Sequence, residues 1–278
     1  MDVPRILLSG VVFGESPRWH GGRLWFSDWG AREVVTVDLA GRRDVVRRMS
    51  TFPFSLDWLP DGRLLIVSSE LQRQEPDGSW VAHADLSHLA AAWNEIVVDG
   101  RGNAYVNQAG FDLMSGAEPS SGTIALATPH DSSREVADDV WFPNGMVVTP
   151  DNSTLIVAES YRNRLTAFDI DGDGDLSNRR VWADLGTDVP DGICMDVEGA
   201  IWYADVPNRH CVRVREGGDV LQTITTDRGC FSCALGGSTG RTLFIVATEW
   251  HGPEGMAKGE PTGQVLTIDV ASAHAGHP

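Results

Sequence analysis

Four oxygen-bearing side chains recur at the same position of a repeated segment in this chain, and their types point to metal chemistry. They are two carboxylates and two amides: Glu15, Asn94, Asn144 and Asp191. Carboxylate and amide oxygens are the ligands that hard divalent cations such as Ca²⁺ and Mg²⁺ prefer, whereas zinc sites more often use His or Cys. The set also leaves coordination positions open for water or substrate, so it predicts a catalytic cation site.

The shared position in the repeat matters because an Asn-Gly or Asp-Gly dipeptide on its own would not indicate a binding site. Asn144-Gly145 and Asp191-Gly192 are each typical of a turn. The aligned positions of the six repeats are Glu15, Phe54, Asn94, Asn144, Asp191 and Ser232. Four of these six carry a carboxylate or amide at one level, and buried polar groups need partners, so a common ligand is favoured over four unrelated turns.

The element that repeats is a turn followed by a short apolar strand. The copies are about 40 to 50 residues apart, which is the length of one four-stranded propeller blade. They occupy residues 22–28, 62–68, 102–106, 153–158, 199–204 and 240–246. The sequence therefore predicts an all-β fold, a six-bladed β-propeller with four-stranded antiparallel blades and a central metal-containing channel. Because no linker or composition break interrupts the repeats, residues 1–278 are predicted to form one domain.

The two ends of the chain both have the pattern of strands, over residues 6–8 and 263–270. We expect them to share one blade, because closing the ring in this way removes an exposed sheet edge. Only residues 86–93 resemble a helical turn. The acidic run 169–175 resembles the start of a calcium-binding EF-hand loop, but Arg180 stands where that loop needs a bidentate Glu, so an exposed hairpin is expected.

Composition excludes several classes of partner. The chain has 22 Lys and Arg against 39 Asp and Glu, a net charge of −17, which argues against binding to nucleic acid or to an anionic membrane. No apolar run reaches the roughly 18 residues that a membrane span needs. The first residues lack the pattern of a signal peptide, so a cytoplasmic protein is predicted. Four cysteines are too few for a disulfide scaffold and are expected to be reduced thiols.

The segments around these residues resemble those of a known family. Gly14–Pro17 with Trp19, Phe142–Gly145 and Pro190–Gly192 are similar to signature segments of the senescence marker protein/gluconolactonase (regucalcin-like) family. The resemblance extends over essentially the whole chain. It implies a six-bladed propeller that holds calcium or another divalent ion in its channel, and an activity that in most members is lactone hydrolysis.

The resemblance also implies roles for individual residues. Glu15, Asn144 and Asp191 would hold the metal, and Asn94 matches an asparagine that contacts the substrate and in some members the ion. Asp191 also matches the proposed general base or nucleophile of the family. The expected cofactor is one divalent cation, most simply Ca²⁺, with Mg²⁺, Mn²⁺ and Zn²⁺ as the other candidates.

Two departures from the family bear on the substrate. Many sugar lactonases carry an arginine and an aspartate where this chain has Ala92 and Glu95, so the group that would bind sugar hydroxyls is missing. Aromatic side chains are instead expected at the mouth of the pocket, with Trp93, Phe142 and Phe231 as substrate-binding residues beside Asn94. Further candidates for this wall are Phe54, Trp141, Trp250 and His251. Such a wall suits an apolar or aromatic small molecule.

The predicted function is hydrolysis of a cyclic ester, with the metal as Lewis acid and Asp191 as general base. Two alternatives remain open. The same centre would also suit phosphotriesters or other activated esters, which related six-bladed enzymes hydrolyse. A propeller that binds a metal or ligand without turnover is the third possibility.

Overall fold

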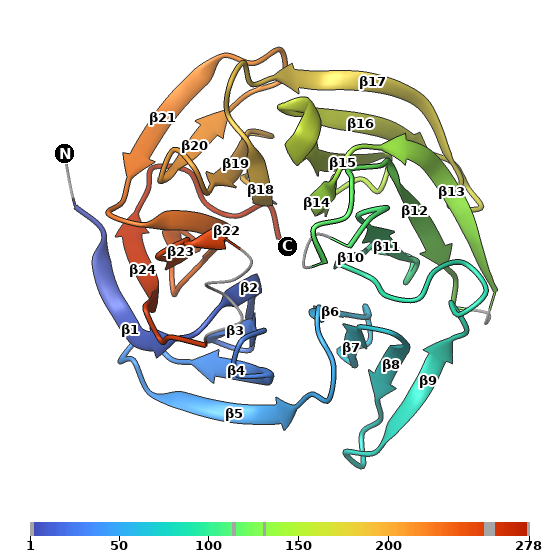
Figure 1. Ribbon diagram of the computed structural model, residues 1–278, viewed down its shortest axis with the longest axis horizontal. Coiled ribbons are helices and arrows are strands. Elements are labelled where there is room, and N and C mark those ends of the chain that lie inside the picture. Colours follow the sequence, from blue (N-terminus) through green and yellow to red (C-terminus); the bar gives the residue numbers. More distant parts are fainter. Residues whose placement is uncertain (1–2, 113–114, 130–131, 253–258, 277–278) are drawn as a thin grey trace.

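The computed structural model describes residues 3–112, 115–129, 132–252 and 259–276. Six four-stranded antiparallel sheets are arranged around a central axis, with one short strand of each sheet nearest that axis (Figure 1). This arrangement confirms the predicted six-bladed β-propeller. Among the described residues, no helix is long and apolar enough to cross a membrane.

The strands of each blade follow one another from the axis outward. Blades 1 and 2 contain β2 (Gly14–His20), β3 (Arg23–Asp28), β4 (Glu33–Val37), β5 (Arg43–Arg48), and β6 (Ser55–Trp58), β7 (Leu64–Val67), β8 (Leu71–Gln74), β9 (Trp80–Ala84). Blades 3 and 4 contain β10 (Glu95–Val98), β11 (Ala104–Gln108), β12 (Gly122–Ala127), β13 (Ser133–Val140), and β14 (Pro143–Val148), β15 (Thr154–Glu159), β16 (Arg164–Ile170), β17 (Leu176–Asp184). Blade 5 contains β18 (Pro190–Met195), β19 (Ile201–Asp205), β20 (His210–Val214) and β21 (Val220–Thr225).

Blade 6 is built from both ends of the chain. It contains β22 (Gly229–Gly236), β23 (Thr242–Thr248), β24 (Gly263–Asp269) and, outermost, β1 (Arg5–Val11). The pairing of β1 with β24 closes the ring, as predicted from the two terminal strand patterns.

The expectation of a helical turn over residues 86–93 was wrong beyond its first residues. The chain forms only a hydrogen-bonded turn, in which the Leu89 N–H donates to the Leu86 carbonyl. Asp85 stabilises this turn by accepting the Ser87 N–H at 2.9 Å. The one short 3₁₀ helix described lies elsewhere, at η2 (Ser160–Arg162) between β15 and β16. The acidic run 169–175 forms the turn between β16 and β17, as expected.

The hydrophobic core lies between adjacent blades. Trp202 of blade 5, for example, packs in one buried cluster with Leu243 and Ile245 of blade 6. All four cysteines belong to this cluster and are free and buried, in agreement with the prediction: Cys194, Cys211, Cys230 and Cys233. Adjacent blades therefore bury their faces against each other, which holds the innermost strands at fixed positions around the axis.

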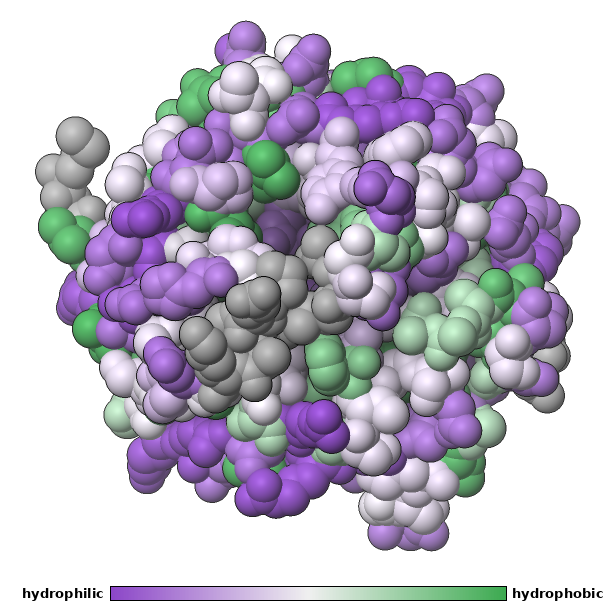
Figure 2. All heavy atoms as spheres, viewed as in Figure 1, coloured by the Kyte–Doolittle hydropathy of each residue, from purple (hydrophilic) through white to green (hydrophobic). Residues whose placement is uncertain are grey.

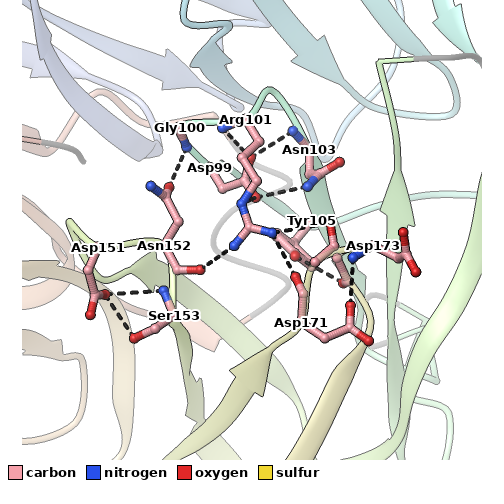
Figure 3. Close-up of polar contacts among 12 residues, drawn as sticks. Asp99, Gly100, Arg101, Asn103, Tyr105, Asp151, Asn152, Ser153, Asp171 and Asp173 are labelled. Atoms are coloured by element: carbon pink, nitrogen blue, oxygen red, sulfur yellow. Dashed lines mark hydrogen bonds and ion pairs between the residues drawn. The ribbon is translucent and has the colours of Figure 1, made fainter.

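Polar contacts join blades 3 and 4 at the ends of their first two strands. Figure 3 shows Arg101 reaching from the turn after β10 toward the neighbouring blade. Its guanidinium donates to the carbonyl oxygens of Asn152 and Asp171, each at 2.7 Å. In return, the Asn152 side chain accepts the Gly100 N–H at 2.5 Å. One exposed arginine thus ties three turns together on this side of the ring.

The C-terminal segment crosses to blade 5 at the end of the innermost strand. The Ala275 N–H donates to the carbonyl of Met195, the last residue of β18, at 3.1 Å. The Val197 N–H donates in turn to Ala273 at 2.9 Å. Asp191 lies near the opposite, amino-terminal end of β18. The two ends of the channel therefore differ, and the candidate site belongs to the end away from the C-terminus.

Candidate metal centre and active site

A cavity of about 390 Å³ opens at the amino-terminal ends of the innermost strands. Seven residues expected from the sequence line it together: Glu15, Asn94, Asn144, Asp191, Phe142, Phe231 and Trp250. The surface seen in Figure 2 is hydrophilic over most of its periphery, carries hydrophobic residues in small separate patches and is hollowed near its centre. The residues are brought together from five blades, as the repeat predicted.

Trp93 does not belong to this cavity, contrary to expectation. Its side chain is 0% exposed and lies in the buried cluster between blades 2 and 3, with Val67 and Ile96. Phe54 is likewise buried in a core cluster and contributes no cavity wall. The two aromatic residues pack in the core between adjacent blades and do not line this cavity.

Local irregularities in the innermost strands aim the polar side chains at the axis. The register with the second strand shifts between Glu15 and Arg18, between Pro143 and Met146, and between Pro190 and Ile193. Bulges of this kind bend a strand and redirect its side chains, and they are common next to active sites. Each of these three bulges contains or begins at a predicted metal ligand.

Two glycines follow predicted ligands because the innermost strands approach each other closely there. A Cβ atom on Gly192 would lie 1.8 Å from Ser232 Oγ of the next blade. A Cβ atom on Gly145 would lie 2.4 Å from the backbone nitrogen of Ile193. The Asn-Gly and Asp-Gly pairs are thus explained by packing at the axis, not by hairpin turns.

Hydrogen bonds fix the orientation of the two amides. Asn94 Nδ2 donates to the Pro143 carbonyl at 3.2 Å, so Oδ1 is the atom left for a ligand. The Asn144 side chain hydrogen-bonds to Asp191. The backbone carbonyl of Asn144 accepts from Asn107 Nδ2 at 2.7 Å. These contacts arise between neighbouring blades, so the ring itself positions the site.

The two candidate ligand carboxylates are buried without a cationic partner among the described residues. Burial raises the pKa of Glu15 well above its usual value, and the nearby charges of Asp191 and Glu95 raise it further. Burial likewise raises the pKa of Asp191, followed by the charges of Glu95 and Asp205. Asp191 Oδ1 has no hydrogen-bond partner in the part of the chain that the structure describes. Such an arrangement is costly unless a positive charge compensates it.

A third carboxylate in the channel does have a cationic partner. Glu95 is paired with Arg18, whose Nη2 lies 3.2 Å from Oε2, and both side chains are only 6% exposed. Arg18 also donates to the Ile96 carbonyl at 2.8 Å, and Ser55 Oγ donates to Glu95 at 3.0 Å. The residue noted from the sequence only as a departure from the family is therefore half of a buried ion pair.

Aromatic side chains form much of the remaining cavity wall. Phe13 stacks on Trp29 with ring centroids 5.8 Å apart, and its edge meets Phe231 at 4.6 Å. Phe142 stacks on Tyr161 at 4.8 Å on another side. The remaining wall residues are Ser160, Val189, Val206, Pro207 and Trp250. Of these five residues, the sequence indicated only Trp250. The other four lie outside the aligned position of the repeat, so the alignment of the copies did not point to them.

A second group with metal-ligand side chains lies beside the cavity. Asp188, Asp205 and His210 bring one ligand atom each within 4.8 Å of one another. Their atoms are already used within the protein, since His210 Nε2 lies 3.0 Å from Asp188 and Tyr203 donates to Asp188 at 2.6 Å. Asp205 accepts the Val189 N–H at 2.8 Å. This cluster supports the segment that leads into Asp191.

Comparison with known proteins agrees with the fold and the signature segments. The family model for the "SMP-30/Gluconolactonase/LRE-like region" matches residues 13–249. The chain is 26% identical to regucalcin of Homo sapiens over 270 residues, covering 92% of this chain and 90% of that protein. It is 29% identical to regucalcin of Danio rerio over 260 residues, covering 88% and 67%.

Solved structures resemble this one over nearly its whole length. The calcium-binding protein regucalcin from Agrobacterium tumefaciens superposes with a TM-score of 0.83 at 22% identity, covering 99% of this chain and 96% of that one. A gluconolactonase from Xanthomonas campestris superposes with a TM-score of 0.77 at 22% identity, covering 98% and 96%. At these identities the likeness shows the fold. Because the family model matches most of the chain, the protein belongs to the SMP-30/gluconolactonase/LRE-like family.

Proposed function

We propose that this protein is a divalent-metal-dependent hydrolase of cyclic esters, acting on lactones with an apolar or aromatic portion. One observation carries the proposal above the others. The carboxyl of Asp191 is 9% exposed and has one oxygen without a partner among the described residues, in a cavity that also contains Glu15 and two amides. The family supports a lactonase-like activity for such a centre.

The residues present fit a hard divalent cation. Glu15, Asn144 and Asp191 would hold it through oxygen atoms, as Ca²⁺ and Mg²⁺ prefer. The two buried carboxylates supply the two negative charges that such an ion neutralises. The description of the Agrobacterium relative as a calcium-binding protein favours Ca²⁺ as the first cation to test.

The chemistry divides between the cation and the side chains. A bound divalent cation supplies Lewis acidity toward the lactone carbonyl. Asp191 accepts the proton of the attacking water, because its Oδ1 has no hydrogen-bond partner among the described residues and lies in the wall of the cavity. Asn94 presents Oδ1 toward the substrate, since its Nδ2 is held by Pro143. The aromatic wall binds the apolar part of the substrate and limits the access of water to it.

The direct test is hydrolysis of a panel of lactones by protein treated with a chelator and then reloaded with single metals. We expect activity only with metal, and a loss of at least about 100-fold in kcat for Asp191→Asn, the size of a general-base contribution. Asp219→Asn, an exposed carboxylate in the turn before β21, is the matched control and should keep wild-type activity. Full activity of Asp191→Asn, or of the chelated protein, would overturn the proposal.

The panel should also contain a phosphotriester and a linear activated ester. Faster turnover of either one than of every lactone would assign the same centre to the alternative chemistry. Thermal stabilisation by metal without turnover of any ester would instead identify a binding protein. Each of these results rejects the lactonase proposal in favour of a named alternative.

A further inference from the structure

A second recess adjoins the candidate active-site cavity between blades 5 and 6. The recess has a volume of about 380 Å³. It shares three wall residues with the inner cavity: Val206, Pro207 and Trp250. The inner cavity and the recess therefore adjoin at these three residues.

The recess differs from the inner cavity in its chemistry. Its charged walls come from the β19–β20 turn, the β21–β22 connection and the segment after β23. They are Arg209, Asp227, Arg228, Glu249 and His251. The inner cavity is walled by aromatic rings, so a molecule that spans both has one apolar and one polar end.

Most of the charges in the recess already have partners. Arg228 lies against Asp227 with two nitrogen–oxygen distances of 2.8 Å. Arg228 also donates to the carbonyl of Thr262. Glu249 and His251 lie 3.6 Å apart. Asp227 is thus paired with Arg228, whereas Glu249 lies beside a histidine that carries a charge only when protonated.

Arg209 is the charged side chain of the recess that has no close partner among the described residues. Its guanidinium has no hydrogen bond or ion pair with any residue that the structure describes. Its charge nevertheless acts inside the recess, because it contributes, after the larger effect of Arg228, to holding the pKa of Asp227 below its usual value. The remaining cation is available to a ligand, on a protein whose net charge of −17 otherwise repels anions.

The backbone of Arg209 is held in place for this role. It adopts a φ of +56°, an uncommon conformation for a residue other than glycine. Its carbonyl accepts hydrogen bonds from the Thr226 N–H at 2.8 Å and from Thr226 Oγ1 at 3.1 Å. The turn is also pinned by the Asn208 N–H, which donates to Asp205 at 2.8 Å. The side chain therefore projects from a fixed turn and not from a free loop.

We infer that this recess binds a carboxylate at the end of the substrate, with Arg209 as the residue that recognises it. The substrate class is then a lactone that carries an aromatic or apolar portion in the inner cavity and an anionic tail in the recess. This inference rests on the proposed function for the position of the lactone ring. Binding of a carboxylate in the recess is a separate prediction, and it can be tested without measuring turnover.

Binding is measured first, by calorimetry on the wild-type protein with an aryl-alkanoate and its neutral amide as probes. We expect the carboxylate to bind at least about tenfold more tightly than the amide, because an arginine–carboxylate pair is a charge-assisted contact. Arg209→Gln should abolish this preference, and Arg209→Glu should reverse it. Arg215→Gln, an exposed arginine in the turn before β21, is the matched control and should retain the preference.

Turnover is measured second, with two lactones that differ only in a free or a methyl-esterified tail carboxylate. Arg209→Gln should lower kcat/KM for the free acid by about tenfold, mainly through KM, and change it by less than about twofold for the methyl ester. Equal preference of wild type and Arg209→Gln in both measurements overturns the recess assignment. Absence of lactone turnover with the binding preference intact rejects only the proposed function.

Discussion

The buried pair of Arg18 and Glu95 offers the strongest test of how charge is arranged in the channel. Arg18→Met removes the only basic side chain that faces Glu95 among the described residues and keeps most of the side-chain volume. Because both side chains are 6% exposed, water does not replace the lost partner. Three carboxylates then share the channel without a cation, Glu15, Glu95 and Asp191. The buried Asp57, whose Oδ1 lies 3.9 Å from Arg18 Nε, loses the same basic neighbour.

The magnitude follows from the burial of the pair. Removing one partner of a buried ion pair costs about 3–5 kcal/mol, because the other charge stays buried and uncompensated. Replacing both partners costs less, so the double variant Arg18→Met/Glu95→Gln should recover part of that loss, although Asp57 still lacks its basic neighbour. A loss of this size in a protein of this length corresponds to a decrease in Tm of roughly 10 °C.

The assay is urea unfolding and thermal unfolding in chelator, followed by the same measurements with Ca²⁺. Metal should stabilise Arg18→Met more than wild type, since the cation then compensates three carboxylates instead of two. The reasoning is refuted if Arg18→Met loses less than about 1 kcal/mol, or if the double variant is no more stable than the single one. Arg42→Met, an arginine whose side chain is 81% exposed, is the control and should unfold like wild type.

Three further predictions concern the same end of the propeller. Gly192→Ala should lose at least about 1–3 kcal/mol of stability, because its Cβ would lie 1.8 Å from Ser232 Oγ, whereas Gly172→Ala, which faces open space, should not. Asp191→Asn should raise the Tm in chelator at pH 7 and remove the stabilisation by Ca²⁺, since it deletes a buried charge; a lower Tm in chelator contradicts this. The pKa of His210 is raised, chiefly by its hydrogen bond to Asp205, so His210→Gln should cost up to about 1 kcal/mol below about pH 6.5 and less as the pH rises through that raised pKa. Urea unfolding at pH 6 and pH 9 tests the last point, and an equal loss at both values rejects it.

The sequence predicted the ring and the polar residues of the site because both follow from a repeat. Asn94, Asn144 and Asp191 each stand at the start of an innermost strand, and six such strands meet at one axis. Identical positions of a repeat occupy equivalent places in a propeller. The level of these side chains in the channel therefore followed from alignment of the copies alone.

The aromatic wall was harder to predict, because it depends on where a strand is irregular. Trp93 precedes Asn94 in a blade whose first strand pairs regularly with the second, so the two side chains point to opposite sides. Phe142 precedes a bulged strand and has a φ of +50°, which turns its ring toward the cavity. Phe231 lies within the register shift between Cys230 and Ser232. Neither a bulge nor a positive φ at a phenylalanine has a signature in this sequence.

The distribution of charge inside the channel explains why a divalent cation suits it. Glu95 is balanced by Arg18 at 3.2 Å, and Asp205 is held by His210 and by backbone N–H groups. Glu15 and Asp191 remain as two buried carboxylates without a basic partner among the residues described. A monovalent cation would leave one of these charges uncompensated, and an additional arginine would occupy the space that a substrate needs. Two negative charges beside two oriented amides would be matched by one divalent ion, which is the reason why we propose a divalent rather than a monovalent cation for this centre.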